Sequence, residues 1–268
     1  MTRFRIVLEY DGTDFEGWQA QREGRRTVQG VVEAALRAVT GAASVRIVGA
    51  GRTDAGVHAE GQVASVALET RLDPATLRRA LDAVLPRDVA ARDVACVPES
   101  FHARRDAVAK LYAYRIWNAP ARSPLRARRS FWVPHALDRA AMRRAAETLR
   151  GTHDFASFEG AGSKPGPTVR SLDRVELVES GPELRFELEG RSFLRHMVRN
   201  VVGTLLEVGR GRRAPDSIAA VLAARSRAAA GPTAPAHGLT LVHVRYVDFP
   251  PQSGGLEANR VDGPEPRG

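Results

Sequence analysis

Residues 193–208 carry the sequence feature that most limits what this chain can fold into, a continuous apolar stripe at helical spacing. The stripe consists of Leu194, Met197, Val198, Val201, Val202, Leu205 and Leu206. This spacing predicts an amphipathic helix from Phe193 to Val208, which Gly209 ends. A helix with so wide an apolar face has to pack against another apolar surface, so the rest of the chain must supply one.

Strands and helices alternate along the rest of the sequence. In the first half, alternating apolar residues predict strands at residues 4–10, 45–48, 62–68 and 89–97. Helices are expected to start at Thr27, ending at Gly41, and at Asp73-Pro74, because a capping side chain precedes the apolar positions. In the second half, the same patterns predict strands at residues 111–117, 172–178, 184–188 and 239–247, and further helices at residues 138–150 and 216–225.

The order of these elements is similar in the two halves, which predicts two α+β units. We expect the units to be joined near residues 105–110, with residues 1–105 as the N-terminal half and residues 106–249 as the C-terminal half. From Pro250 the chain is rich in proline, glycine and polar residues, so residues 250–268 are expected to form a disordered tail.

The charge of the chain favours a polyanionic partner. Its 268 residues include 40 lysines and arginines against 31 aspartates and glutamates, which gives a net charge of +9 and a pI near 10.7. Counterion release from phosphates would drive the binding of such a chain to nucleic acid. Charge alone is unspecific, so the class of polyanion has to come from the motifs.

Other features set the expected compartment and exclude several kinds of site. The single cysteine, Cys96, excludes an internal disulfide framework and leaves too few thiolates for a structural zinc or iron–sulfur site. No stretch approaches the roughly 20 apolar residues of a membrane helix, and the first residues begin a strand pattern instead of a signal peptide. We therefore expect no membrane association and place the chain in the cytoplasm.

A glycine-rich loop over residues 49–61 carries the most chemistry. Arg52, Asp54 and His58 lie there among glycines, which allow sharp turns and close approach of a substrate. The start of the loop resembles a dinucleotide fingerprint, but Asp54 stands where the last glycine is required and a strand follows instead of a helix. A nucleotide-dependent oxidoreductase is therefore excluded. A lone loop aspartate commonly caps a turn, and that structural role stays open on these residues alone.

The sequence of this loop, Gly51-Arg52-Thr53-Asp54-Ala55-Gly56-Val57-His58, resembles the signature loop of the TruA family of tRNA pseudouridine synthases. Other segments resemble that family in the same order along the chain. They are Glu9–Gly12, Gly17–Gln19, Thr27–Gly30, Phe101–Arg104, Tyr112–Arg115 and Phe193–Asn200. The resemblance spans roughly residues 4 to 248, and several independent motifs at family-like spacing carry it.

The resemblance implies a fold and a reaction. The fold is the pseudouridine synthase fold, an α+β architecture of two similar α/β halves with antiparallel or mixed sheets flanking a central basic cleft. Such enzymes cut the bond between ribose C1′ and uracil N1, rotate the base and join C1′ to C5, without a cofactor or metal. Asp54 is the implied catalytic residue. Attack on the sugar, attack on the ring and removal of a ribose proton all remain open as its role.

The resemblance also implies partners for Asp54 and a binding site for the base. An arginine beside a carboxylate favours its ionised form, and Arg52 and Arg199 are the two candidates. Tyr112 is expected to lie against the target uracil, where its phenol could also exchange a proton. For Arg199 a solvated helix face, and for Tyr112 simple core packing, are the structural alternatives.

Three further residues are weaker candidates for contact with RNA. His58 and His102 could each touch the substrate, although a histidine in such a loop often bonds only to the backbone. Arg104 is assigned to substrate binding, together with a basic stretch from Arg122 to Arg129. A stacked base has to be extruded before it can react, so phosphate and shape contacts should dominate recognition.

The family acts on uridines 38 to 40 of the tRNA anticodon stem-loop and works as a homodimer, with one tRNA touching both subunits. The competing interpretation is a basic RNA-binding module without catalysis. A carboxylate inside a basic cleft opposes phosphate binding, so its presence favours catalysis. This chain departs from the family at Asp82, where asparagine is common, and at Asp106, where a small residue is common. Both departures bear on affinity more than on the class of reaction.

Overall fold

The computed structural model describes residues 1–21, 24–163 and 165–247, which include ten strands. They are β1 (Thr2–Tyr10), β2 (Val48–Gly49), β3 (His58–Leu68), β4 (Val89–Cys96), β5 (Ala109–Trp117), β6 (Phe131–Trp132), β7 (Gly151–Asp154), β8 (Val169–Ser180), β9 (Glu183–Gly190) and β10 (Leu239–Arg245). All belong to one mixed sheet in the order β4-β1-β3-β10-β5-β9-β8-β7, with β2 beside β3 and β6 beside β5. The predicted tail, residues 250–268, lies outside the described residues.

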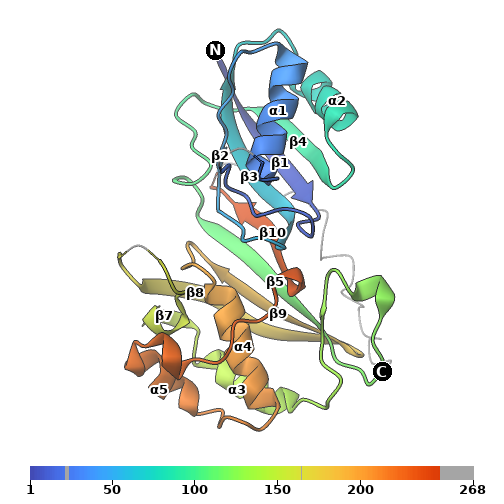
Figure 1. The fold of residues 1–268 in the computed structure, drawn as a ribbon. Helices are drawn as coiled ribbons and strands as arrows, with labels where there is room; N and C mark the ends of the chain where they lie inside the picture. The colour runs from blue at the N-terminus through green and yellow to red at the C-terminus, as the bar shows by residue number, and fades with distance from the viewer. Residues whose placement is uncertain (22–23, 164, 248–268) are drawn as a thin grey trace, which may run out of the picture.

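Five α-helices accompany the sheet in the described part of the chain. They are α1 (Val28–Thr40), α2 (Pro74–Val84), α3 (Arg139–Glu147), α4 (Met197–Gly209) and α5 (Ser217–Ala224). Short 3-10 turns are η1 (Pro124–Arg126), η2 (Ala156–Phe158), η3 (Arg227–Ala229) and η4 (Ala236–Gly238). Helices α1 and α2 accompany β1 to β4, whereas α3, α4 and α5 accompany β7 to β9 (Figure 1). No helix among these residues is long and apolar enough to cross a membrane.

The ends of the helices follow the predicted capping signals. The Thr27 side chain accepts a hydrogen bond from the Gly30 amide at the start of α1, and Gly41 ends that helix with φ 71°. Asp73 caps α2 in the same way, with Pro74 in its first turn, and Asp138 caps α3. Local sequence therefore suffices to place these ends.

The last strand ties the two predicted halves together. β10 pairs in parallel with β3 and antiparallel with β5, so it lies at the centre of the sheet (Figure 1). The predicted join near residues 105–110 falls between β4 and β5. The sheet is thus continuous across that join, and the division into halves stays a prediction.

Several predicted boundaries were wrong, including those of β3, α4, α3 and β2. β3 starts at His58 instead of Gln62, because Ala59 pairs with Tyr10 and Leu241 in strands distant in sequence. α4 starts at Met197 instead of Phe193, because His196 has the left-handed φ of 58° and interrupts the helical backbone. α3 ends at Glu147, three residues early, and β2 consists of Val48–Gly49, so that only Val48 of the expected strand at residues 45–48 belongs to it.

Candidate active site

The aspartate loop, defined as residues 50–57, connects β2 to β3 and is held from several sides. The Trp18 amide donates to the Thr53 carbonyl at 3.0 Å, and the hydroxyls of Tyr10 and Thr53 share a hydrogen bond of 2.8 Å. The Gln62 side-chain amide donates to the Gly51 carbonyl at 2.9 Å. These bonds fix the backbone on both sides of Asp54.

Two glycines in the loop that follows β1 allow its backbone to pack closely against the aspartate loop. A Cβ at Gly12 would lie 2.0 Å from the Val57 carbonyl oxygen, which no side chain could tolerate. Gly17 has φ 94°, and a Cβ there would lie 2.9 Å from the Thr53 carbonyl oxygen. Close backbone packing therefore explains why glycines follow β1 at these two positions.

Asp54 forms an ion pair with Arg199, which comes from α4 in the other half of the chain. Arg199 Nη1 lies 3.2 Å from Asp54 Oδ2, and Arg199 Nε donates to the Ala234 carbonyl at 2.8 Å. The Arg199 side chain is only 15% exposed, whereas that of Asp54 is 30% exposed. The arginine is thus clamped at two points, and the carboxylate stays accessible from solvent.

His196 is a second neighbour of Asp54 that the sequence analysis missed. Its Nε2 lies 3.5 Å from Asp54 Oδ2, and its ring packs so closely on Gly160 that a Cβ there would lie 2.7 Å from Nδ1. Burial lowers the pKa of His196, and the Asp54 charge opposes that effect while Arg199 adds to it. No local sequence signal predicted this position, because His196 has a left-handed backbone and lies just before α4.

Tyr112 points from β5 toward the aspartate loop. Its hydroxyl would lie 3.6 Å from a Cβ at Gly51, and its ring meets Phe193 edge to face with centroids 5.0 Å apart. Burial, followed by Tyr10 and Asp54, raises the pKa of Tyr112, so the phenol is neutral at pH 7. The hydroxyl makes no hydrogen bond to a described residue, whereas that of Tyr114 donates to the Pro235 carbonyl. Of the two tyrosines of β5, Tyr112 is therefore the one whose hydroxyl has no partner among the described residues, and the residue is 7% exposed.

The structure separates the two candidate arginines. Arg199 contacts Asp54, whereas Arg52 is exposed and forms no ion pair with a carboxylate among residues 1–21, 24–163 and 165–247. The Arg52 charge instead acts on Arg104, whose pKa is lowered by burial and then by Arg52. Arg52 thus faces a neighbouring cation and not the carboxylate that the sequence analysis proposed for it.

His58 is buried and bonded within the protein. The Gly12 amide donates to its Nδ1 at 3.1 Å, and its Nε2 lies 3.2 Å from the His237 carbonyl. Burial lowers the pKa of His58, so the neutral ring with hydrogen on Nε2 satisfies both bonds. With an exposed fraction of 3%, His58 offers no surface to RNA here, and this geometry favours the backbone-bonding alternative.

His102 organises the turn that carries Arg104. The amides of Arg104 and Arg105 both donate to His102 Nδ1 at 3.2 Å, and the His102 amide donates to Asp106 Oδ2 at 2.7 Å. Asp106, one of the departures from the family, therefore closes this turn. The other departure, Asp82, pairs with Arg78 and accepts from the Ala91 amide.

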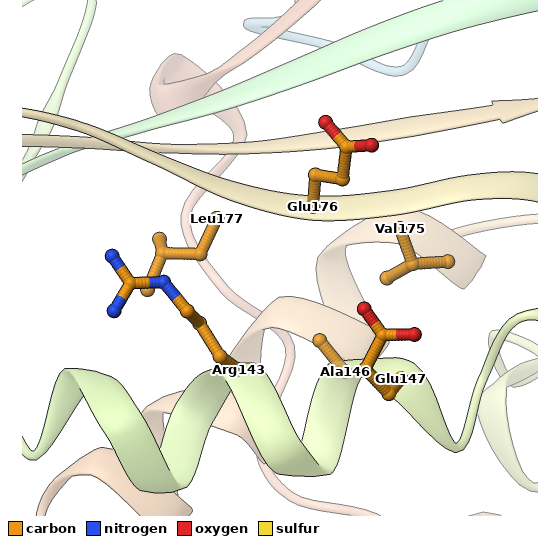
Figure 2. Close-up of a pocket in the computed structure, with 6 residues that line it drawn as sticks. All are labelled: Arg143, Ala146, Glu147, Val175, Glu176 and Leu177. Atoms are coloured by element: carbon orange, nitrogen blue, oxygen red, sulfur yellow. The ribbon is translucent and has the colours of Figure 1, made fainter.

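A cavity of about 210 Å³ lies elsewhere, between α3 and β8 (Figure 2). Its lining consists of Arg143, Ala146, Glu147, Val175, Glu176 and Leu177. It contains none of the candidate residues, and Arg143 is ion-paired with Glu179. Within the described ranges, no group of histidine, cysteine or carboxylate side chains is arranged to hold a metal ion.

Comparison with known proteins identifies the family. Residues 6–106 and 145–247 match the sequence profile of the tRNA pseudouridine synthases. The protein named tRNA pseudouridine synthase A of Syntrophotalea carbinolica is 46% identical over 92% of this chain and 97% of its own length. The protein of the same name from Geobacillus kaustophilus is 45% identical over 92% of this chain and 95% of its own length.

A weaker likeness appears among solved structures. A chain in the structure of an H/ACA RNP bound to a substrate RNA containing 2′-deoxyuridine covers 76% of this chain and 44% of its own, with a TM-score of 0.34 and 14% identity. The family assignment rests on the sequence matches, which confirm the predicted family and fold class. The chain belongs to the tRNA pseudouridine synthase family and is an isomerase that acts on uridine in tRNA.

Proposed function

We propose that this enzyme converts uridine to pseudouridine at positions 38, 39 and 40 of the tRNA anticodon stem-loop, with Asp54 as the catalytic carboxylate. The observation that carries the proposal is the Asp54–Arg199 ion pair at 3.2 Å, formed by the loop and the helix that resemble the family motifs. The largely buried Arg199 orients the carboxylate and supplies a compensating charge, as each of the possible roles of Asp54 requires.

The residues around Asp54 suit a base that has been extruded from its stack. Tyr112 supplies an aromatic surface with a free hydroxyl, and Phe193 supports its ring from the side. An extruded base is commonly held by stacking on aromatic side chains and by hydrogen bonds to its polar edge. Tyr112 therefore serves in substrate binding, with a phenol positioned to exchange a proton.

Tritium release tests the reaction. A tRNA transcript with tritium at C5 of its uridines, and uridine at position 39 as the only anticodon-arm target, is incubated with the purified protein. Joining C1′ to C5 expels the label into water, so one equivalent per tRNA should be released. Intact tRNA binding without release would argue against this site of action. Matched transcripts with uridine moved to position 38 or 40 test the remaining positions.

Tyr112→Phe should lower kcat for tritium release by about 100-fold, the loss expected when one general acid or base is removed. The ring remains, so KM should stay within about threefold because stacking is unchanged. Tyr114→Phe is the matched control on the same strand, since its hydroxyl bonds to Pro235 and should matter for stability only. An unchanged kcat in Tyr112→Phe would restrict Tyr112 to the role of an aromatic wall.

The basic stretch from Arg122 to Arg129 divides into paired and unpaired arginines. Arg126 stacks on Trp117 and pairs with Glu183, and Arg129 pairs with Asp11 across the two halves. Arg122 and Arg128 are exposed and form no ion pair with a described residue. These two arginines are therefore the ones most available to RNA phosphates.

Reversing both charges, in Arg122→Glu/Arg128→Glu, should weaken tRNA binding by about tenfold or more and reduce the salt dependence of binding by about two phosphate contacts. The control Arg37→Glu/Arg144→Glu changes the net charge equally at exposed positions on α1 and α3. Binding is measured by fluorescence anisotropy from 50 to 300 mM salt. If both double variants lose the same affinity for tRNA, the effect comes from net charge and not from contacts of Arg122 and Arg128.

The same proposal includes a homodimer in the cytoplasm, in which one tRNA contacts both subunits, as the family resemblance implies. Leu125 is 95% exposed and Trp132 is 41% exposed, both near the basic stretch. Apolar side chains at such exposure are common where a second chain binds. They support an interface in this region.

A further inference from the structure

Four cations gather beside the aspartate loop without an acidic partner. This cation cluster consists of Arg52, Arg104, Lys110 and Arg191. None of them lies within 4.0 Å of a carboxylate in the part of the chain that the structure describes, although many other arginines there are ion-paired. Like charges repel each other, so a cluster of this kind is stable mainly when an anion is bound.

Lys110 is the buried member of the cation cluster. It is only 7% exposed, and its Nζ donates to the Arg191 carbonyl at 3.0 Å. Burial, then the charges of Arg104 and Arg191, lower the pKa of Lys110 to about 8. A carbonyl satisfies one of its three N–H donors, and an ammonium group in such surroundings gains most from a negatively charged acceptor.

Lys110 also lies next to the proposed position of the uracil. Lys110 and Tyr112 are two residues apart on β5, so their side chains project from the same face. A Cβ at Gly51 would lie 3.6 Å from both Lys110 Cε and the Tyr112 hydroxyl. The lysine is thus the immediate neighbour of the aromatic surface, on the side of Gly51 in the aspartate loop.

The exposed members of the cation cluster are carried by ordered backbone. Arg104 lies in the turn that His102 and Asp106 close, and Arg191 directly follows β9, where Gly190 pairs with Lys110. The side chains of Arg104 and Arg191 are exposed. They can therefore add contacts to a ligand that Lys110 alone would bind through a single ammonium group. The arrangement brings guanidinium groups and one ammonium group together, a combination that suits a small anion.

We propose that the cation cluster binds one phosphodiester group of the tRNA backbone directly beside the target uridine, with Lys110 as its buried contact. This proposal rests on the proposed function, since it places the base of that nucleotide on Tyr112. The bound phosphate fixes the sugar relative to Asp54 and supplies the negative charge that the cation cluster lacks. Extrusion of the base is thereby favoured, because the charge is neutralised only when the nucleotide enters the site.

A double-mutant cycle between protein and RNA tests the contact. All proteins carry Asp54→Asn, so that binding is measured without turnover. The tRNAs are ligated with a single uncharged methylphosphonate at the phosphate on either side of uridine 39. Lys110→Met should weaken binding of unmodified tRNA by about tenfold, as expected for a charge-assisted hydrogen bond. One of the two methylphosphonates should weaken binding equally.

The combination decides the proposal. In Lys110→Met, that methylphosphonate should weaken binding by clearly less than about tenfold, because one of the partners of the phosphate is already absent. Losses that multiply at both phosphates would overturn the proposal. The same double-mutant cycle is measured with Arg104→Gln and with Arg191→Gln, which change exposed side chains and leave the buried Lys110 in place. Arg37→Gln removes the same charge at a distant exposed position and serves as the control. If Lys110→Met unfolds, additive losses in both exposed variants overturn the proposal.

Failure of this inference is separable from failure of the proposed function. Tritium release by the protein with Asp54 intact establishes the reaction at position 39 whatever the cycle shows. Release together with additive losses would reject only the phosphate contact. Absence of release would reject the proposed site of action, and the phosphate contact beside uridine 39 would be rejected with it.

Discussion

Replacing Asp54 by asparagine should lower tritium release by about 10⁴-fold or more, the scale of loss when an enzyme's nucleophile or essential base is removed. Asparagine has nearly the same shape but carries no charge, so it can neither attack carbon nor accept a proton at neutral pH. Single-turnover measurement with enzyme in excess isolates the chemical step from product release. This loss is the largest that we expect from any single substitution in the chain.

Measuring tRNA binding by Asp54→Asn shows whether the variant has lost catalysis alone or has lost its fold. Asp54→Asn should bind tRNA at least as well as the native protein, because a negative charge is removed from a basic site. Asp82→Asn is the matched control, since it removes an exposed carboxylate in the same half that pairs with Arg78. Release by Asp54→Asn within tenfold of the native rate would remove Asp54 from the chemistry and require another carboxylate.

Short-range sequence signals predicted much of the fold. The Thr27 cap and the left-handed Gly41 delimit α1, and Asp73-Pro74 starts α2, because capping depends on residues three or four apart. The strands predicted at residues 172–178 and 184–188 correspond to β8 and β9, which pair as a hairpin across Gly181, where φ is 59°. Such features need no knowledge of the rest of the chain.

Features that depend on distant residues were not predicted. β10 lies between β3 and β5, and this central position extends β3 back to His58 through pairs with Thr240 and Leu241. Alternation within a strand shows which residues face a core, but it does not identify the neighbouring strands. Local sequence patterns therefore do not predict which strands pair when the strands are distant in the sequence.

The composition of the candidate site follows the same division. The motifs selected Asp54 and Tyr112 together with two arginines, but only the packing of α4 against the loop shows that Arg199 is the partner. The left-handed backbone at His196 places a histidine beside Asp54, and no local propensity predicts it, because a positive φ is uncommon for any residue other than glycine. Strained residues of this kind are often found at functional sites.

Replacing Arg199 by glutamine should lower kcat for tritium release by about 10²- to 10³-fold, which is typical for loss of one preorganised electrostatic contact. Arg199 contacts Asp54 through Nη1 and the Ala234 carbonyl through Nε, so glutamine loses both the charge and the clamp. Arg199→Lys restores the charge but cannot reproduce both contacts at once, and its rate should lie between those of the native protein and Arg199→Gln.

Arg195→Gln provides the control for these variants, because Arg195 lies four residues earlier, is exposed and donates to the Ala161 carbonyl instead of contacting Asp54. Its rate should stay within about threefold of the native value, as expected for an exposed residue that makes no contact with Asp54. Thermal unfolding of every variant separates loss of the ion pair from loss of the fold. A role limited to stability would lower the melting temperature of Arg199→Gln and leave single-turnover rates unchanged at low temperature. If Arg199 orients Asp54, we expect the reverse: Arg199→Gln is folded and binds tRNA normally, but its chemical step is slow. The single-turnover rates of Arg199→Gln, Arg199→Lys and the native protein then separate the effect of charge from that of geometry.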